Sequence, residues 1–377
     1  MLTLIAFIIL LSILVLVHEL GHFLAAKKIG VKVEEFGLGY PPRIFGKKVG
    51  ETIYSLNALP FGGFVRLYGE ESAEQNLTSK TKKSQSKQNS ALQRAFFNRS
   101  KIERSIILVA GVAMNFLLGV VVISYLFTQG VAIPNGALVE EVVPKTPAEI
   151  AGIKKGDVIT SVNGQTIASA GDLVSQTKQN VLKIVTLQIK RCEKTCANLK
   201  ISLIPRKDYP QNEGAMGVAI VTDFMIKTYS LWEAPIKGTI EAFRMSWFIA
   251  KGVGQVLWQL VSSFTVPKDV AGPIGIYKVT GQALQFGGLM GVLQLLALLS
   301  LNLAVINILP IPALDGGRFF LVLVEAVMGR QRIIKIEKVA QSVGMALILA
   351  LIVLITISDL SKLTTVQNFL KGFKLGF

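Results

Sequence analysis

The pentapeptide His18-Glu-Leu-Gly-His22 lies near the end of an apolar stretch that runs from Leu4 to Ala26. On a helix, residues i and i+4 share a face, so both imidazoles can reach one metal ion while Glu19 stands beside its water ligand. These are the only two histidines of the chain, and Glu19 is the only charged residue in its stretch. A charge at the bilayer centre costs about 2.5–3.5 kcal/mol, which favours a functional role. The alternative is a polar contact between helices, with Glu19 reaching toward water.

The composition is that of a membrane protein. Of 377 residues, 51% are hydrophobic, the mean hydropathy is +0.52, and the charged residues gather in a few blocks. We therefore predict a polytopic α-helical membrane protein with four transmembrane helices. The four apolar stretches long enough to cross about 30 Å of hydrocarbon are Leu4–Ala26, Ser105–Phe127, Leu289–Leu309 and Val339–Ser358. A cleavable signal peptide is an alternative for the first, but its positive charge follows rather than precedes the apolar run.

Basic residues predict the orientation in the membrane. Residues 27–103 carry 14 Lys and Arg against 7 Asp and Glu, and such an excess marks the cytoplasmic side. Both termini and residues 129–288 are then expected outside, with the histidine pair toward the cytoplasm. The formal net charge of +16 calls for no nucleic acid, because basic residues beside a membrane meet anionic lipid head groups.

The region between the first two stretches is predicted to contain β-hairpins close to the membrane. Residues Val33–Leu67 alternate apolar and polar positions and are rich in glycine and aromatic residues. The Ser-, Lys-, Gln- and Asn-rich run from Ser72 to Ser90 is predicted to be a mobile cytoplasmic linker.

Residues 129–208 have the pattern of a small soluble α+β domain, with a turn at Asn163-Gly164 and a helix at Gly171–Gln179. The segment beginning Ala137-Leu-Val-Glu-Glu-Val-Val-Pro and the segment Ala151-Gly-Ile-Lys-Lys-Gly-Asp resemble a bacterial PDZ domain. The resemblance implies a groove between a strand and a helix that binds an extended peptide as an added strand.

Two further features lie in the outer segment. Cys192 and Cys196 are the only cysteines, and their spacing fits a disulfide in a hairpin outside the membrane or, equally, two free thiols. Residues 209–288 are predicted to form a connector with an amphipathic helix, which can lie on the membrane surface or cover the neighbouring domain; ordinary packing is the alternative. Its apolar stripe is Trp232, Ile236, Ile240, Phe243 and Trp247, beside the charged Glu233, Lys237, Glu241 and Arg244.

A catalytic zinc site usually has three protein ligands and an open fourth position, and no third histidine exists here. Asp315 is the strongest candidate, because it follows the third apolar stretch in Asn307-Ile-Leu-Pro310-Ile-Pro312-Ala-Leu-Asp315. The two prolines break the helix and place irregular backbone at membrane depth, where it is tolerated only beside a protein-buried or wet cavity. A helix N-cap is the alternative role for Asp315.

These motifs together resemble the site-2 protease family, specifically its bacterial RseP-type branch of intramembrane zinc metalloproteases. The resemblance implies a Zn²⁺ ion held by His18, His22 and Asp315, with Glu19 as the catalytic base. It covers nearly the whole chain and extends to Phe36-Gly-Leu-Gly, Pro60-Phe-Gly-Gly-Phe-Val and Gly272-Pro-Ile-Gly.

The resemblance also implies how substrate is bound. Asn307, with Pro310 and Pro312 beside it, and Gly62 and Gly63 in a hairpin edge strand are the implied substrate-binding residues. The implied partners are single-pass transmembrane proteins in the lipid bilayer, such as anti-sigma factors or remnant signal peptides, with an extracytoplasmic segment at the PDZ groove. Some relatives carry two tandem PDZ domains, whereas this chain has room for one.

We therefore expect a bacterial inner-membrane protein in four parts. A first catalytic membrane half in residues 1–128 and a second in 289–377 flank a PDZ domain in 129–208 and the connector in 209–288. A proteolytically inactive PDZ scaffold and a metal-ion carrier are the rival functions. The complete set of expected ligands and base favours the protease, and an active Glu19→Gln variant would favour either rival.

Overall fold

The computed structural model describes residues 1–70, 92–192, 196–210, 213–263 and 270–361. The linker predicted for Ser72–Ser90 lies outside these residues. The chain forms two compact units, the first made of Met1–Leu126 together with Trp232–Phe377 and the second of Phe127–Leu231. The second unit is thus inserted, in sequence, between the two halves of the first.

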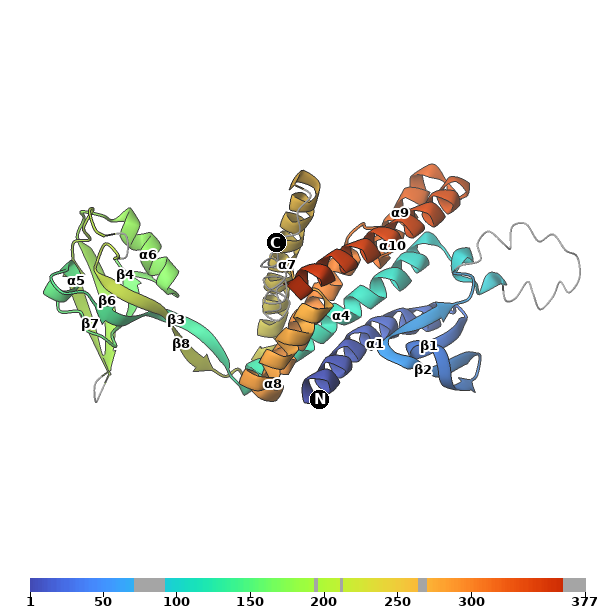
Figure 1. Cartoon of the computed structure of the whole chain (residues 1–377), viewed down its shortest axis with the longest axis horizontal. Helices are drawn as coiled ribbons and strands as arrows, with labels where there is room; N and C mark the ends of the chain where they lie inside the picture. Colours follow the sequence, from blue (N-terminus) through green and yellow to red (C-terminus); the bar gives the residue numbers. More distant parts are fainter. Residues whose placement is uncertain (71–91, 193–195, 211–212, 264–269, 362–377) are drawn as a thin grey trace, which may run out of the picture. The chain divides into compact units, whose positions relative to one another are not determined.

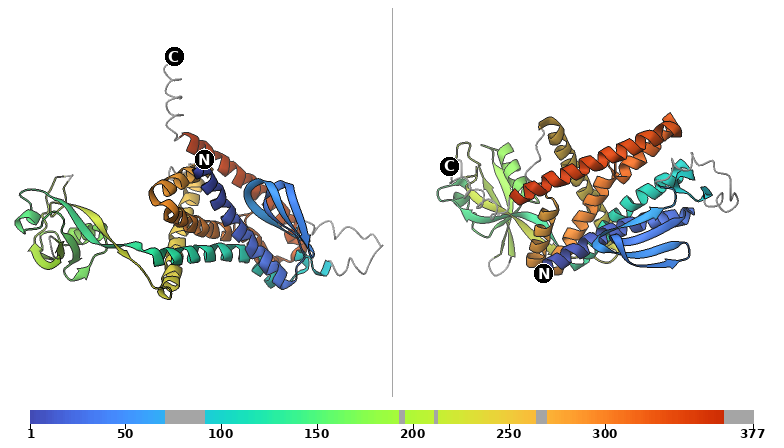
Figure 2. Two further views of the ribbon diagram at one scale, coloured as in Figure 1. Left: turned by 90° about the horizontal axis from the view of Figure 1, so that it is seen from below. Right: turned by 45° about the vertical axis from the view of Figure 1, so that its right-hand side comes forward.

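The membrane fold is confirmed by the helices of the first unit. Within the described residues, four helical segments are long and apolar enough to cross a membrane, and they match the four predicted stretches (Figures 1 and 2). They are α1 (Leu2–Ile29), α4 (Lys101–Gln129), α8 (Pro273–Ile308) and residues Val339–Leu360 of α10 (Arg330–Ser361), and the unit also contains η1 (Phe96–Asn98), α7 (Glu233–Ser263) and α9 (Asp315–Met328).

α8 consists of two helical parts joined at Gly288, whose φ of 55° and ψ of −138° interrupt the helix. The predicted third apolar stretch begins directly after this break, at Leu289. The first part begins with the Gly272-Pro-Ile-Gly275 motif, where Asp359 of α10 accepts hydrogen bonds from the backbone N–H groups of both glycines at 2.9 and 2.8 Å. A carboxylate at a helix N-terminus accepts hydrogen bonds from amides that have no partner within the helix, and it is attracted by the partial positive charge of that end. This contact therefore holds α10 against α8.

One antiparallel pair of long strands, β1 (Val33–Val49) and β2 (Thr52–Leu67), occupies the region predicted to form β-hairpins. Residues 35–38 of β1 have partners in two separate parts of β2, at 53–56 and again at 63–66. The strands therefore bend back on themselves, and β2 lies along α1 (Figures 1 and 2).

The C-terminal end of α1 fastens this hairpin. The Phe23 ring lies 5.1 Å from that of Phe36, and the Glu51 carboxylate in the β1–β2 turn forms ion pairs with Arg94 at 2.7 Å and Lys27 at 3.0 Å. The hydrogen bonds from Arg94, and then from Lys27, lower the pKa of Glu51 to about 2. The hairpin is thus held to α1 by the Phe23–Phe36 contact in β1 and by the Lys27–Glu51 ion pair at its turn.

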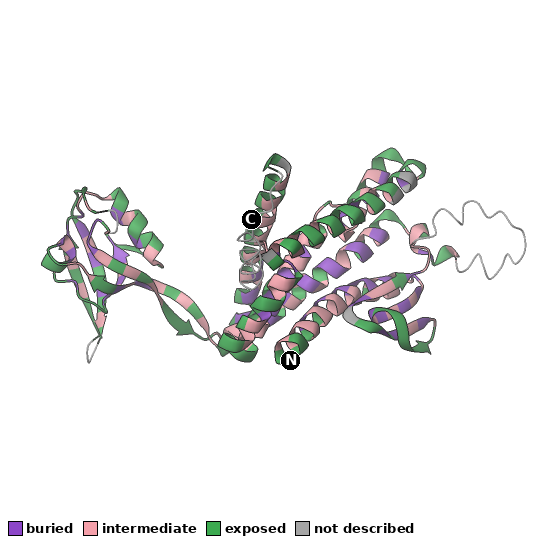
Figure 3. Ribbon diagram, in the orientation of Figure 1, coloured by how far each residue is buried: buried purple, intermediate pink, exposed green. Residues whose placement is uncertain are grey.

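The second unit is a six-stranded sheet in the order β7-β6-β4-β3-β8, with β5 paired to β4, and its strands carry a buried aliphatic core (Figure 3). Asn163 and Gly164 have positive φ values of 51° and 80°, as the predicted tight turn requires. Its elements are β3 (Val131–Val142), α5 (Pro147–Ile150), β4 (Val158–Val162), β5 (Gln165–Thr166), α6 (Ala170–Gln179), β6 (Val185–Cys192), β7 (Cys196–Leu203) and β8 (Val218–Lys227).

Two details of this unit go beyond the sequence expectations. β8 pairs with β3 from Val131↔Lys227 to Val142↔Val218, so the compact unit extends past residue 208, where we predicted the domain to end. Long-range strand pairing of this kind leaves no local sequence signal. Cys192 and Cys196 form a disulfide, with Cα atoms 4.1 Å apart, which resolves the two alternatives left open by their spacing.

α7 covers most of the segment predicted to form an amphipathic helix. Ala234 and Ala242 on one face are buried, whereas the apolar stripe is 59–88% exposed in this structure. The exposed residues are Trp232, Ile236, Ile240, Phe243 and Trp247. Contact of this stripe with lipid or with the second unit stays a prediction.

Candidate active site

α1 carries His18, Glu19 and His22 in its C-terminal half, where α4 passes close to it. Both histidines are buried, with 7% of each exposed, and Glu19 is half-buried. A Cβ at Gly111 of α4 would lie 2.3 Å from Nε2 of His22, and one at Gly21 would lie 2.3 Å from a backbone carbonyl of α4. The two glycines therefore permit the close helix contact that brings α4 up to the imidazoles.

Asp315 meets the two histidines, as predicted. Its Oδ2 atom lies 2.9 Å from Nε2 of His18 and 3.2 Å from Nε2 of His22, and the two Nε2 atoms are 3.2 Å apart. Asp315 is the first residue of α9, and the N-cap position belongs to Leu314, which makes no side-chain cap. The capping alternative therefore does not describe Asp315.

These three ligand atoms fit a zinc ion. Ligands at about 2.0–2.1 Å from a tetrahedral zinc lie about 3.3 Å from one another, close to the separations found here. Oδ2 of Asp315 is buried, and within the described residues its contacts with the two Nε2 atoms lack hydrogen-bond geometry. A buried anionic oxygen without a donor is costly, and a cation between it and the imidazoles removes that cost. Two imidazoles and one carboxylate leave the fourth position free, as in catalytic zinc sites.

The loop between α8 and α9 turns Asp315 toward the histidines. Pro310 and Pro312 follow the end of α8, and neither can continue the helix. A Cβ at Gly316 would lie 2.3 Å, and one at Gly317 2.2 Å, from backbone carbonyls of this turn. The glycines after Asp315 are therefore required for the tight return of the chain, whereas no substrate contact of the prolines follows from their positions.

Polar groups surround the imidazoles on both sides. Nδ1 of His22 donates to the carbonyl of Ile107 at 2.8 Å, and Nδ1 of His18 lies 3.2 Å from the side-chain amide of Asn115. Asn307, at the end of α8, places its amide nitrogen 3.5 Å from Nε2 of His18. Each histidine thus turns Nε2 toward the ligand cluster and Nδ1 toward α4, while Asn307 borders the cluster.

The last part of β2 passes directly beside Glu19. Gly62 has a φ of 79°, and a Cβ placed on it would lie 3.4 Å from Val15 of α1. A Cβ at Gly63 would lie 2.8 Å from a β1 carbonyl and 4.0 Å from Cγ of Glu19. The backbone N–H of Val65 donates to Oε2 of Glu19 at 3.0 Å. The two predicted glycines therefore allow a strand edge to approach the expected base.

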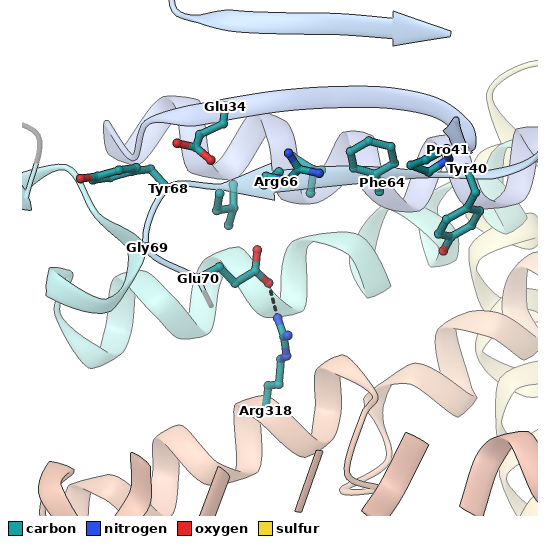
Figure 4. A pocket seen from close by; sticks show the side chains of 11 residues that line it. Glu34, Tyr40, Pro41, Phe64, Arg66, Tyr68, Gly69, Glu70 and Arg318 are labelled. Atoms are coloured by element: carbon teal, nitrogen blue, oxygen red, sulfur yellow. Dashed lines mark hydrogen bonds and ion pairs between the residues drawn. The ribbon is translucent and has the colours of Figure 1, made fainter. Parts of the chain in front are cut away.

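Two cavities lie between the hairpin and the helices. One of about 320 Å³ is lined by the histidines, Glu19 and Asp315, and it shares Tyr40, Phe64, Glu70 and Arg318 with a second of about 430 Å³. Figure 4 shows the second cavity, in which Arg318 extends from α9 to form an ion pair with Glu70 beyond the end of β2. The strand edge and the site thus face shared open space.

A buried ion pair secures the helix that carries Asp315. Arg104 of α4 binds both carboxylate oxygens of Glu325 in α9, at 2.7 and 2.8 Å, and each side chain is less than a tenth exposed. Because α4 also contacts the histidines, this pair links both sides of the ligand cluster.

Sequence reasoning missed four contributors to the site. Asn115 is a polar residue inside an apolar stretch, which was a usable signal of function. Val65 acts through its backbone, which no side-chain pattern reveals. The ion pairs of Arg104 and Arg318 join segments far apart in sequence, so only the folded chain identifies their partners.

Four helices long enough to span a membrane, together with two histidines and an aspartate that can hold a metal ion beside a glutamate, define the class of membrane-embedded metallopeptidases. Comparison with known families agrees with this class. The chain belongs to peptidase family M50, whose family model matches residues 6–351, and it is a protease. The resemblance to site-2 proteases is thereby confirmed.

Curated relatives extend over nearly the whole chain. A Clostridium acetobutylicum protein named as a candidate zinc metalloprotease is 34% identical over 351 residues, covering 92% of this chain and 94% of its own. The regulator of sigma-W protease RasP of Bacillus subtilis is 29% identical, covering 96% of this chain and 99% of its own. The zinc metalloprotease RasP of Shouchella clausii is 30% identical with the same coverages.

Proposed function

We propose that this protease is a zinc-dependent intramembrane endopeptidase that hydrolyses peptide bonds in transmembrane segments of single-pass membrane proteins. The observation that carries the proposal is the meeting of His18, His22 and Asp315 within 3.2 Å of one another, beside Glu19, on helices of a membrane protein. The zinc metalloprotease names of its relatives support the choice of metal.

The geometry supports a role for each of these residues. His18, His22 and Asp315 would hold the ion, which when bound supplies a Lewis acid that acidifies water and polarises a peptide carbonyl. Glu19 shares the cavity with the ligands and accepts the proton of the attacking water, then returns it to the leaving amine. Asn307 borders the ligand cluster and in this proposal holds the substrate backbone.

The hairpin supports a mechanism for substrate binding. A transmembrane helix shields its peptide bonds with its own hydrogen bonds, so cleavage requires local unwinding. Residues 63–66 run beside Glu19, and a peptide paired with this edge would recover backbone hydrogen bonds within reach of the base. Gly62 and Gly63 contribute by letting the strand come close, and Pro310 and Pro312 by ending α8 before the loop that carries Asp315.

We propose that the second unit is a PDZ domain that selects substrates. A groove of about 380 Å³ lies between α6 and the start of β8, lined by Leu173, Val174, Lys178, Val218 and Ile220 among others. An apolar groove between a helix and a strand fits the addition of an extended peptide. The proposed ligands all lie outside this unit, so its deletion should leave zinc bound and should retain or broaden cleavage.

We also propose an orientation with the ligand cluster toward the cytoplasm of a bacterial inner membrane and the second unit outside. The basic residues of the 27–103 segment support it. A cysteine replacing Lys48 should be labelled by an impermeant reagent only from the cytoplasmic side, and one replacing Asn163 only from outside. Labelling of both from one side would refute the arrangement.

The substrate class rests on the family. The B. subtilis relative is named for regulation of sigma-W, which supports an anti-sigma factor; a remnant signal peptide has the same single-pass form. The test is to incubate the purified full chain with a single-pass substrate and map the cut by mass spectrometry. We expect zinc-dependent cleavage in the transmembrane segment that Glu19→Gln abolishes. Unchanged cleavage in that variant would mean that Glu19 is not the base, and no cleavage by zinc-loaded wild type would point to the scaffold or carrier function.

A further inference from the structure

Asn115 is a buried polar residue of α4 with an incomplete set of hydrogen bonds. Its side chain is 0% exposed, and its Nδ2 atom lies 3.2 Å from Nδ1 of His18. Its Oδ1 atom has no hydrogen-bond partner among the described residues. The hydroxyl of Ser300 donates to the Asn115 backbone carbonyl at 2.7 Å, so α8 holds this turn of α4 in place. A buried amide so placed requires a reason beyond packing.

The chemistry of imidazole gives a reason for a buried amide beside His18. A neutral imidazole carries its proton on one nitrogen, and the hydrogen bond made by the other nitrogen determines which. If Nε2 of His18 binds the ion, Nδ1 carries the proton and needs an acceptor. His22 has such an acceptor in the Ile107 carbonyl at 2.8 Å. For His18 the group that faces Nδ1 is the Asn115 amide.

The amide can serve both tautomers of His18. With Nδ2 toward the ring, as here, it donates to Nδ1 and leaves a proton for Nε2, which faces Asp315 at 2.9 Å. Rotation of the amide by 180° presents Oδ1 instead, with no change in side-chain shape. Oδ1, which has no partner in the present orientation, then accepts from Nδ1–H, and Nε2 is free to bind the ion.

We propose that Asn115 is a positioning residue of the metal site, whose amide oxygen holds His18 in the orientation and tautomer that bind the ion. The inference rests on the proposed function, since it takes His18 as a ligand. It assigns to α4 the outer hydrogen bonds of both histidines, one through a backbone carbonyl and one through a side chain. Such partners raise ligand basicity and fix the ring.

The test compares zinc affinities of the purified full chain by competition with a chelator. Asn115→Leu preserves the approximate shape of the side chain but removes the acceptor, and we expect affinity to fall about 10–100-fold. Asn115→Asp keeps an acceptor facing Nδ1–H, and we expect affinity within about threefold of wild type or tighter. The matched control is Thr280→Val, which removes another buried polar group, bonded only within its own helix, and should leave zinc affinity unchanged.

A packing role for Asn115 predicts the reverse order. Leucine would then be tolerated, and an unpaired buried aspartate would be the more damaging change. Wild-type affinity in Asn115→Leu, or the loss of zinc in Asn115→Asp but not in Asn115→Leu, would overturn the inference. Failure of wild type itself to bind zinc would instead contradict the proposed function, so the two failures are distinguishable.

A second measurement covers the case in which the aspartate variant does not fold. The chain has two histidines, so ¹⁵N-histidine labelling gives a spectrum of only two imidazoles. In zinc-loaded wild type we expect both rings to carry the proton on Nδ1 and to exchange it slowly. In Asn115→Leu the His18 proton should exchange faster while His22 is unchanged. Equal protection of His18 in both proteins would contradict the role of Asn115.

Discussion

The backbone N–H of Val65 donates a hydrogen bond to Oε2 of Glu19 over 3.0 Å. One contact therefore joins the two parts of the site that have different tasks, the strand edge that would bind the substrate and the carboxylate that would move the proton. A peptide added at this edge competes for the same amide or lies directly against the base. Under the proposed function, this single hydrogen bond would couple substrate binding to catalysis.

Glu19→Gln should separate catalysis from metal binding. The amide removes the base but none of the three ligands, so we expect zinc near one per chain and proteolysis lowered by about 10²–10⁴-fold. Metal analysis and cleavage of a single-pass substrate measure the two quantities on the same preparation. Zinc loss in this variant would mean that Glu19 is itself a ligand.

Asp315→Asn, in contrast, should weaken metal binding itself. An amide is an uncharged and poorer zinc ligand than a carboxylate, so zinc binding should weaken markedly, and cleavage should fall with it. His22→Ala is the reference for loss of a ligand. An Asp315→Asn protein with full zinc and normal cleavage would place the third ligand elsewhere.

Gly63→Ala should impair cleavage while zinc stays bound. The added Cβ would lie 2.8 Å from a backbone carbonyl of β1, so the strand beside Glu19 must shift. Gly46→Ala is the matched control on the same hairpin, because its nearest neighbours are side chains rather than backbone, those of Arg43 at 2.9 Å and Ile53 at 3.5 Å. We expect a fall in kcat/KM for a transmembrane substrate in the first variant and not in the second. Equal kcat/KM values for the two variants would show that the β2 edge beside Glu19 takes no part in substrate binding.

Breaking the buried Arg104–Glu325 pair should destabilise the helical unit. Removal of one partner leaves an uncompensated buried charge, which typically costs about 3–5 kcal/mol, so Glu325→Gln should lower the thermal unfolding temperature clearly. Replacement of both residues by Leu removes both charges and should recover most of that loss. If the single and double variants unfold alike, the pair is not coupled.

Glu51 should make the hairpin sensitive to acid. Its folded pKa of about 2 lies below the ordinary value of 4.5, so folding favours the carboxylate. The resulting stability is fully present above about pH 4.5 and is lost as the pH falls toward 2. Thermal unfolding measured across this range should show a slope that Glu51→Gln reduces. The same slope in both proteins would assign the acid sensitivity to other carboxylates.

The sequence by itself determined the features that have a local pattern. Apolar length gives the four membrane helices, the i, i+4 spacing puts His18 and His22 on one face, and the Asn163-Gly164 pair gives a tight turn. Asp315 was predicted as the third ligand because few acidic residues stand beside a broken membrane helix. Each of these depends on hydrophobicity or backbone preference within a few residues.

Only the tertiary structure decided which distant groups meet. The Nδ1 partner of His18 on α4, the amide of Val65 beside Glu19, the Arg104–Glu325 pair and the pairing of β8 with β3 all join segments that are far apart in the chain. The geometry of the histidine contacts depends on how closely α1 and α4 approach each other. Gly21 and Gly111 permit the close approach, but glycines at these positions do not by themselves predict it. The proposed ligands can therefore be selected from the sequence, whereas their orientation is a property of helix packing.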